Sequence, residues 1–244
     1  MSKIGLQLYS IKEIASVNFP GAIELAAASG YHGVEFAGFF NTPAEEVLRC
    51  LQKNNMEPCG SHTSIDILTA EFEKTVEYNI AIGNEYIVVP WIPEEMRNSR
   101  DAWLSTAEKF NGLNDRLKTH KLKLGYHNHA FEFEKFGDKY GFDIFAENTS
   151  SDILLEIDLY WVEYPGLSAV EYVKRYKDRL ELLHVKDLAE DRTSTEIGSG
   201  KIDFTEIVEE AGDTKWFIVE QEHFVIPQDK SIAISREYLG GLLK

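Results

Sequence analysis

Eight short β-rich runs alternate with helical segments along the chain, and this alternation constrains the fold more than any single motif. The β-rich runs cover residues 3–9, 31–36, 57–62, 85–90, 121–127, 152–158, 180–186 and 215–222. In the segments between them, apolar residues recur at i, i+3 and i+4, which is the spacing of a helix packed on one face. Strands that alternate with helices in this way form a parallel sheet that the helices cover.

The number and size of these units favour a closed barrel. Eight strand–helix units of about 30 residues each match the size of a (β/α)8 barrel. An open, doubly wound sheet is the alternative, but no G-x-G-x-x-G motif follows the first predicted strand. No Pro-, Gly- or Ser-rich linker divides the sequence. We therefore predict the α/β class, with a single (β/α)8 TIM barrel domain over residues 1–244.

The composition disfavours several classes of partner. The chain has 41 acidic and 25 basic residues, a formal net charge of −16, whereas a protein that binds a phosphate backbone needs Lys and Arg. We therefore expect no nucleic acid as substrate. No stretch approaches the roughly 18 apolar residues of a membrane span, and the N-terminus lacks a signal-peptide pattern. Cys50 and Cys59 do not suggest a disulfide framework, so we expect a cytoplasmic protein without a membrane partner.

The late strands of such a barrel would deliver metal-binding side chains to its catalytic face, at the C-terminal ends of the strands. Asp158 ends the run LLEID, His184 lies near the end of LELLHVK, and Glu220 follows WFIV. Two carboxylates and an imidazole on adjacent strands suit Mn²⁺, Mg²⁺, Co²⁺ or Zn²⁺. The alternative is that each is a separately hydrogen-bonded polar residue at a strand end.

Several segments together resemble the sugar phosphate isomerase/epimerase family, which has the xylose-isomerase-like barrel. They are GYHNHAFEF (125–133), EIDLYWV (156–162), LHVKD (183–187), IGSGKIDF (197–204) and FIVEQE (217–222). The resemblance extends over essentially the whole chain. It implies a metal-dependent TIM barrel with proton-transfer chemistry on sugars, cyclitols or their keto derivatives, and a homodimer or homotetramer.

The resemblance also implies a set of metal ligands: a glutamate on strand five, an aspartate on six, a histidine on seven and a glutamate on eight. Asp158, His184 and Glu220 match the last three. Strand five departs from the pattern, because His127 stands where the family has glutamate. We favour Glu132, just downstream, as the fourth ligand, since a third carboxylate suits a Mn²⁺-type site; His127 itself is the alternative. One Mn²⁺ ion is the expected cofactor, with Mg²⁺, Co²⁺ or Zn²⁺ as alternatives.

Further residues at the predicted rim are expected to contact a carbohydrate substrate. His129 alternates with His127 on one strand, so both face the same side. Two tryptophans offer apolar walls for a sugar ring, and a lysine offers a point charge for a substrate oxygen. The expected substrate-binding residues are His62, Trp91, His129, Trp161 and Lys186. Each also has a structural interpretation: packing for the tryptophans, a structural role for His62, hydrogen bonds to the backbone for His129 together with His127, and a surface pair with Asp187 for Lys186. Glu35 is expected only to support the packing of strand two.

The expected chemistry begins with removal of a proton beside a metal-polarised carbonyl. Glu220 is the expected ligand and general base, and Glu132 or His127 the opposing acid/base. The predicted function is a divalent-metal-dependent isomerase or epimerase acting on an unphosphorylated sugar, keto-sugar or inosose. The alternatives are a dehydratase of an inosose-like polyol ketone, a non-catalytic sugar-binding barrel, and the endonuclease branch of the fold family, which the net charge disfavours.

Overall fold

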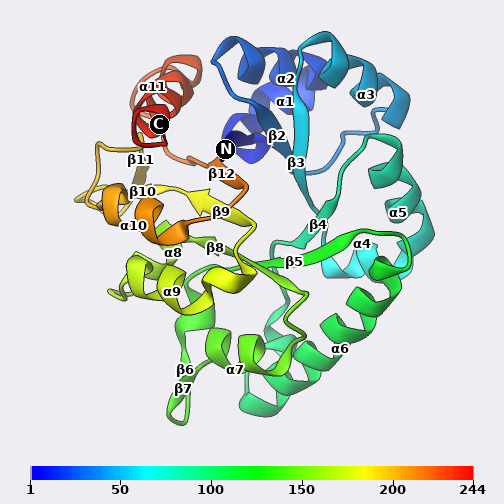
Figure 1. Ribbon diagram of the computed structural model, residues 1–244, viewed down its shortest axis with the longest axis vertical. Coiled ribbons are helices and arrows are strands. Elements are labelled where there is room, and N and C mark those ends of the chain that lie inside the picture. The colour runs from blue at the N-terminus through cyan, green and yellow to red at the C-terminus, as the bar shows by residue number, and fades with distance from the viewer. Residues whose placement is uncertain (1, 244) are drawn as a thin grey trace.

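The computed structural model describes residues 2–243, which form a closed barrel of parallel strands surrounded by helices (Figure 1). The strands follow one another in chain order around the barrel, and the last pairs in parallel with the first. They are β1 (Lys3–Gln7), β2 (Gly33–Phe36), β3 (Glu57–His62), β4 (Tyr86–Val89), β5 (Lys123–His127), β8 (Leu154–Asp158), β9 (Leu182–Val185) and β12 (Trp216–Val219). Each lies within one of the predicted runs, so the prediction of an α/β TIM barrel is confirmed.

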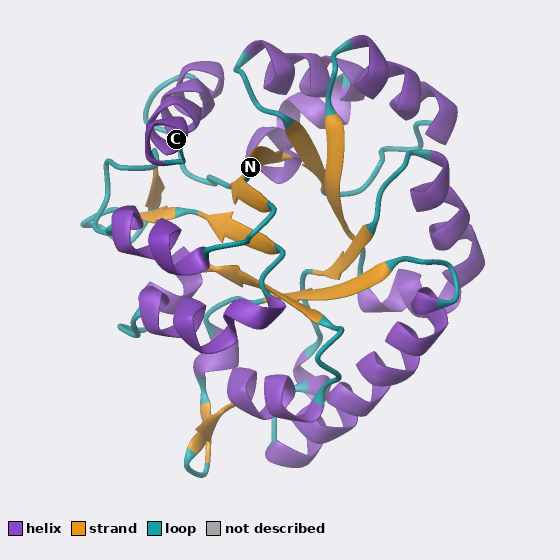
Figure 2. Cartoon of the chain, viewed as in Figure 1, coloured by secondary structure: helices purple, strands orange, loops and turns teal. Residues whose placement is uncertain are grey.

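The helices form the outer layer of the molecule (Figure 2). They are α2 (Phe19–Ala28), α3 (Ala44–Lys53), α4 (Ile65–Ala70), α5 (Phe72–Ala81), α6 (Arg100–Lys118), α7 (Gly141–Asn148), α9 (Ala169–Tyr176), α10 (Phe204–Ala211) and α11 (Gln228–Leu242). Polar side chains begin several of them; the Ser99 side chain, for example, accepts a hydrogen bond from the N–H of Ala102 at the start of α6. Across residues 2–243, no helix combines the length and the apolar character needed to cross a membrane.

Short elements follow the C-terminal ends of several strands and surround that rim of the barrel. Helices α1 (Lys12–Val17) and α8 (Leu159–Glu163) follow β1 and β8 closely. Two small antiparallel hairpins, β6 (Lys135–Phe136) with β7 (Lys139–Tyr140) and β10 (Asp187–Leu188) with β11 (Ser194–Thr195), follow β5 and β9. These insertions lengthen the loops on which the active sites of TIM barrels are built.

Two apolar clusters form the core. The larger one contains the side chains that the strands direct outward against the helices, such as Ile87, Leu155 and Phe217. The smaller one, here called the inner apolar layer, consists of the alternate strand residues Cys59, Tyr86, Val88, Leu154, Leu182, Trp216 and Ile218. Because alternate residues of a strand face opposite sides, this layer fills the inside of the barrel below the C-terminal rim.

Glu181 joins four strands at the N-terminal end of the barrel. Its Oε2 lies 2.7 Å from Lys215 Nζ and accepts a 2.9 Å hydrogen bond from the Tyr86 hydroxyl, while Lys123 donates to Oε1. Burial alone would raise the pKa of Glu181, but these donors outweigh it and lower the pKa to about 2. The four residues stand at or just before the starts of β4, β5, β9 and β12.

Replacing Glu181 by Gln should lower the free energy of unfolding at pH 7 by about 1–2 kcal/mol, because three donors lose an ionised acceptor. The pKa of the folded-state carboxyl lies below the ordinary value of 4.5, so its contribution is present above that pH and is lost as the pH falls towards 2. Urea unfolding curves at pH 7 and at about pH 3 measure the difference, which should shrink at the lower pH.

Glu147→Gln is the matched control, because it removes only an exposed ion pair with Lys139 and should change stability little. Equal losses in both variants, or an equal loss for Glu181→Gln at both pH values, would contradict the assignment.

Candidate metal centre

Polar side chains continue the inner face of the barrel above the inner apolar layer. On β8, for example, Leu154 belongs to that layer, and the next two residues on the same face are Glu156 and Asp158. Both carboxylates are fully buried. The charged and histidine side chains that meet at the centre of the barrel are Glu35, His62, His127, Glu156, Asp158, His184, Lys186 and Glu220.

Four of these residues, here called the outer group, converge on one space: His127, Asp158, His184 and Glu220. One ligand atom from each lies within 4.8 Å of the others. His184 Nδ1 is 3.0 Å from Glu220 Oε2 and 3.9 Å from Asp158 Oδ2, which is also 3.9 Å from His127 Nε2. Among the described residues, Asp158 Oδ2 and His184 Nδ1 are buried and make no hydrogen bond; the 3.0 Å approach of His184 Nδ1 to Glu220 Oε2 is a contact without hydrogen-bond geometry. Such atoms need a partner, and two nitrogen and two oxygen donors fit a divalent ion.

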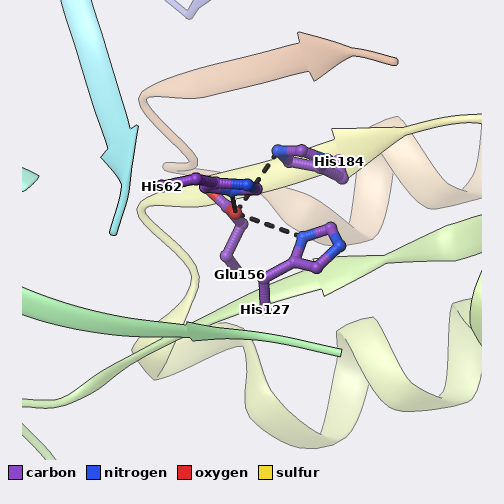
Figure 3. Close-up of side chains that lie close together, drawn as sticks. All are labelled: His62, His127, Glu156 and His184. Atoms are coloured by element: carbon purple, nitrogen blue, oxygen red, sulfur yellow. Dashed lines mark hydrogen bonds and ion pairs between the residues drawn. The ribbon is translucent and has the colours of Figure 1, made fainter. Parts of the chain in front are cut away.

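A second pair of carboxylates, Glu35 and Glu156, contacts the ring nitrogens of His127 and His184 that face away from Asp158. Glu156 Oε2 lies 2.8 Å from His62 Nε2, 3.2 Å from His127 Nδ1 and 3.3 Å from His184 Nε2. Figure 3 shows the three rings around this carboxylate. Glu35 Oε2 lies 2.6 Å from His184 Nε2. We call these two residues the supporting carboxylates.

The supporting carboxylates determine which ring nitrogens are available to an ion. An imidazole that donates its N–H to a carboxylate presents the lone pair of its other nitrogen. Glu35 therefore directs Nδ1 of His184 towards Asp158 and Glu220, and Glu156 directs Nε2 of His127 towards Asp158. His62, His127, Glu156 and His184 also have the spacing of a metal site. Because this set shares two histidines with the outer group, one ion would occupy one set or the other.

Space for Glu35 comes from the neighbouring strand. A side chain at Gly60, on β3, would place its Cβ 2.4 Å from Glu35 Oε1. The Gln7 side-chain amide donates to Glu35 Oε2 at 2.7 Å. Glycine at position 60 and glutamine at position 7 thus hold the carboxylate against His184.

The buried charges favour a cation at this centre. Burial is the main cause that raises the pKa of Asp158 to about 7, and burial with the nearby charge of Glu35 raises the pKa of Glu156 to about 7. Burial alone would also raise the pKa of Glu220, but the Lys186 ammonium and His184 outweigh it and lower the pKa. A divalent ion bound by the outer group would supply positive charge to carboxylates that are costly to ionise when buried.

Lys186 lies inside the barrel rather than at the surface. Its side chain is 1% exposed, its Nζ lies 3.3 Å from Glu220 Oε1, and it also donates to Glu222. Asp187 does not pair with it; the Asp187 carboxylate instead accepts backbone N–H groups of Gly198 and Gly200, both at 2.9 Å. The alternative of a surface Lys186–Asp187 pair is therefore not what the structure contains.

A cavity of about 470 Å³ opens above the outer group. His127 and Glu220 line it, so part of the outer group faces this space. Of the predicted substrate-binding residues, the cavity wall includes His62, Trp91, His129 and Trp161, but not Lys186. Burial lowers the pKa of His129 to about 4, which keeps its imidazole neutral at pH 7. Its Nδ1 has no hydrogen-bond partner among the described residues.

The structure does not bring Glu132 to the outer group, and His127 lies there instead. After β5 a short turn at Phe131–Phe133 folds Glu132 back behind the strand. There its two oxygens accept hydrogen bonds from the Tyr126 hydroxyl at 2.6 Å and the backbone N–H of His129 at 2.7 Å. Tyr126 belongs to the outward-facing core. Burial raises the pKa of Glu132 to about 7.

Three acidic residues of the site have no predicted role in the chemistry: Glu35, Glu156 and Glu222. Glu35 was expected only to support strand packing, yet its carboxylate contacts His184. Glu156 carries a signal in the sequence, because it stands two residues before Asp158 within an apolar run and so faces the same side. Glu222 lines the cavity beside Glu220 and stands two residues after it.

Comparisons with known proteins agree with this architecture. Residues 23–240 match the family model of the xylose isomerase-like TIM barrel. An inosose dehydratase of Clostridium perfringens is 24% identical over 263 residues, covering 90% of this chain and 86% of that protein. A sugar phosphate isomerase/epimerase structure from Parabacteroides distasonis, 24% identical, has a TM-score of 0.85 and covers 100% of this chain and 96% of that one. The structure of an IolI protein with a bound zinc atom, 14% identical, has a TM-score of 0.79 with 99% and 98% coverage. The chain belongs to the xylose isomerase-like TIM barrel family.

Proposed function

We propose that this protein is a divalent-metal-dependent isomerase or epimerase that transfers a proton beside the carbonyl of a sugar, keto-sugar or inosose. The observation that carries the proposal is the convergence of His127, Asp158, His184 and Glu220 at a cavity of about 470 Å³. Two atoms of this group, Asp158 Oδ2 and His184 Nδ1, are buried and make no hydrogen bond to any residue that the structure describes.

In this proposal the outer group holds one divalent ion. A bound ion would polarise the substrate carbonyl and stabilise the negative charge that develops when the neighbouring C–H bond breaks. Mn²⁺ remains the first choice. Two imidazoles and two carboxylates also suit Zn²⁺ or Co²⁺.

The side chains around the cavity would supply the base, the opposing acid/base and the contacts to the substrate. Glu220 is the proposed general base, and Lys186 beside it favours its ionised form. As a ligand, His127 would bind the ion through Nε2 while its Nδ1 faces Glu156 Oε2, so neither ring nitrogen is free to act as the opposing acid/base. Glu220, by contrast, has a second carboxylate oxygen for its role as base. Glu222 is then the better candidate for the opposing acid/base, because it lines the cavity and lies outside the outer group. The neutral His129 imidazole can hydrogen-bond a substrate hydroxyl, and the Trp91 and Trp161 rings can cover an apolar sugar face.

A second candidate function is dehydration of an inosose-like polyol ketone. Similarity to an inosose dehydratase over 90% of this chain favours it. The first step would be the same proton removal. The electron pair of the broken C–H bond would then form a C=C bond, while the β-hydroxyl group leaves with the C–O pair and a proton from a general acid, as water. Both candidates fit a reducing, cytoplasmic setting, since Cys50 and Cys59 are buried free thiols.

The purified protein should contain about one divalent ion per chain, and His184→Ala and Asp158→Asn should lose it because each removes a donor. His127→Ala should also lose the ion, whereas Glu132→Gln should keep it, because Glu132 is bonded elsewhere. Elemental mass spectrometry measures the metal, and circular dichroism confirms that each variant is folded.

Two results would contradict these expectations. Loss of metal in Glu132→Gln with retention in His127→Ala would restore Glu132 as the fourth ligand. Wild-type protein that binds neither Mn²⁺, Co²⁺ nor Zn²⁺ after supplementation would overturn the proposed function.

Glu156→Gln should weaken metal binding by roughly 10- to 100-fold, because the amide no longer provides a full carboxylate to orient His127 and His184. Competition with a chromophoric chelator measures the affinity. Glu147→Gln, an exposed change far from the barrel centre, is the control. Abolished binding in Glu156→Gln, with full binding in Asp158→Asn and Glu220→Gln, would instead place the ion among His62, His127, Glu156 and His184.

Metal-loaded protein in D₂O should introduce deuterium beside the carbonyl of at least one member of a panel of ketoses, keto-sugars with a blocked anomeric carbon, and inososes. Glu220→Gln should slow this exchange by roughly 10²- to 10⁴-fold, because the base is removed. Proton NMR follows both exchange and product. A rearranged sugar identifies isomerisation or epimerisation, whereas an unsaturated product identifies the dehydratase. No exchange on any member would leave a sugar-binding barrel.

A further inference from the structure

The cavity of about 470 Å³ above the outer group is here called the metal cavity. A second cavity, of about 600 Å³, lies beside it and shares His62 and Gly38 with it. Its walls come from the segment after β2 (residues 38–42), from the end of β3 and the turn that follows it, and from helices α4 and α5. Figure 1 labels β2, α4 and α5. No atom lies within 4 Å of the position that a Cβ would take at Gly38. The backbone therefore leaves open space where the two cavities meet.

The second cavity has an apolar wall that is unusually exposed. Phe40 and Ile67 both line it and are 42% and 50% exposed. The Phe39 ring packs against the Tyr78 ring with 4.2 Å between centroids, and both residues also line the cavity. Exposed apolar side chains gathered at a cavity mark a binding surface more often than isolated ones do.

The segment after β2 has an unfavourable backbone conformation. Phe40 and Asn41 have φ values of 48° and 58°, in the left-handed region that a phenylalanine rarely adopts. The Tyr78 hydroxyl donates to the Thr42 carbonyl oxygen at 2.6 Å and ties the segment to α5. A strained backbone that is fixed in this way is characteristic of residues shaped for a ligand.

The charges at the second cavity favour a neutral ligand. Lys74 lines it, but its ammonium is already paired with Glu71 at 2.7 Å. Among the described residues of the wall there is no other lysine and no arginine. An anionic group such as a phosphate would therefore lack an unpaired cation here, whereas an aromatic ring would contact Phe39, Phe40 and Ile67.

We propose that the second cavity is a subsite for the neutral aromatic aglycone of a glycoside, whose sugar ring occupies the metal cavity. The proposal rests on the proposed function and narrows its substrate class. A free sugar or inosose would leave the apolar wall uncovered. Since a glycosidic bond ties up the anomeric carbon, the reactive carbonyl would stand at another ring carbon, and the substrate would be a keto-glycoside.

The test uses protein with ¹³C-labelled isoleucine methyl groups and a matched pair of probes, phenyl and methyl β-D-glucopyranoside. Phenyl glucoside should shift the Ile67 δ1-methyl signal through its ring current, and methyl glucoside should not. Ile80, on α5 and 51% exposed but outside the cavity wall, is the internal control and should not move. Phenyl glucoside should bind about tenfold more tightly, because the ring buries apolar surface.

Two variants complete the test. Ile67→Asp should abolish the roughly tenfold preference for phenyl over methyl glucoside, and Ile80→Asp should keep it. Equal affinities in the wild-type protein, the same preference in Ile67→Asp, or no Ile67 shift with the phenyl β-glycosides of glucose, galactose and xylose would each overturn the subsite. The titration is run on metal-free and Zn²⁺-loaded protein with metal content measured separately, so a missing metal site is distinguished from a missing aglycone subsite.

Discussion

The contact between His184 and Glu35 determines how the centre of the barrel is organised. It joins β9 to β2 across the inside of the barrel, with 2.6 Å between Nε2 and Oε2. By taking up one ring nitrogen, it leaves the other directed towards Asp158 and Glu220. Glu156 likewise contacts Nδ1 of His127 and leaves its Nε2 directed towards Asp158. Without these two carboxylates the rings of His127 and His184 could rotate or carry the proton on the other nitrogen. The four side chains of the outer group would then no longer direct their donor atoms to one point.

The sequence allowed the architecture and three of the four residues of the outer group to be predicted. The eight β-rich runs and the helical spacing between them were sufficient for the barrel, because both periodicities are local properties of the chain. Asp158, His184 and Glu220 could also be predicted, since each directly continues an apolar strand and strand ends meet at one rim. Their convergence follows from the fold alone and needs no knowledge of side-chain contacts.

The remaining residues depend on contacts that the local sequence does not reveal. Glu132 was favoured as a ligand because of its chemistry, but a short turn after β5 directs it to the Tyr126 hydroxyl on the other side of the strand. The role of Glu35 depends on the absence of a side chain at Gly60, a position on the neighbouring strand. Glu156 was predictable in principle from its two-residue spacing to Asp158.

The inner apolar layer separates two parts of the barrel that have different tasks. Towards the N-terminal end, Glu181 holds the strands together through Lys123, Lys215 and the hydroxyl of Tyr86, itself a member of the layer. On the other side, ionisable groups gather around His184. Residues that share no partners usually contribute independently to stability. Over evolutionary time, the upper side chains of such a barrel could therefore be exchanged while the lower half kept the chain folded. A scaffold divided in this way can acquire new chemistry by small steps, because a change at the rim leaves the contacts around Glu181 intact.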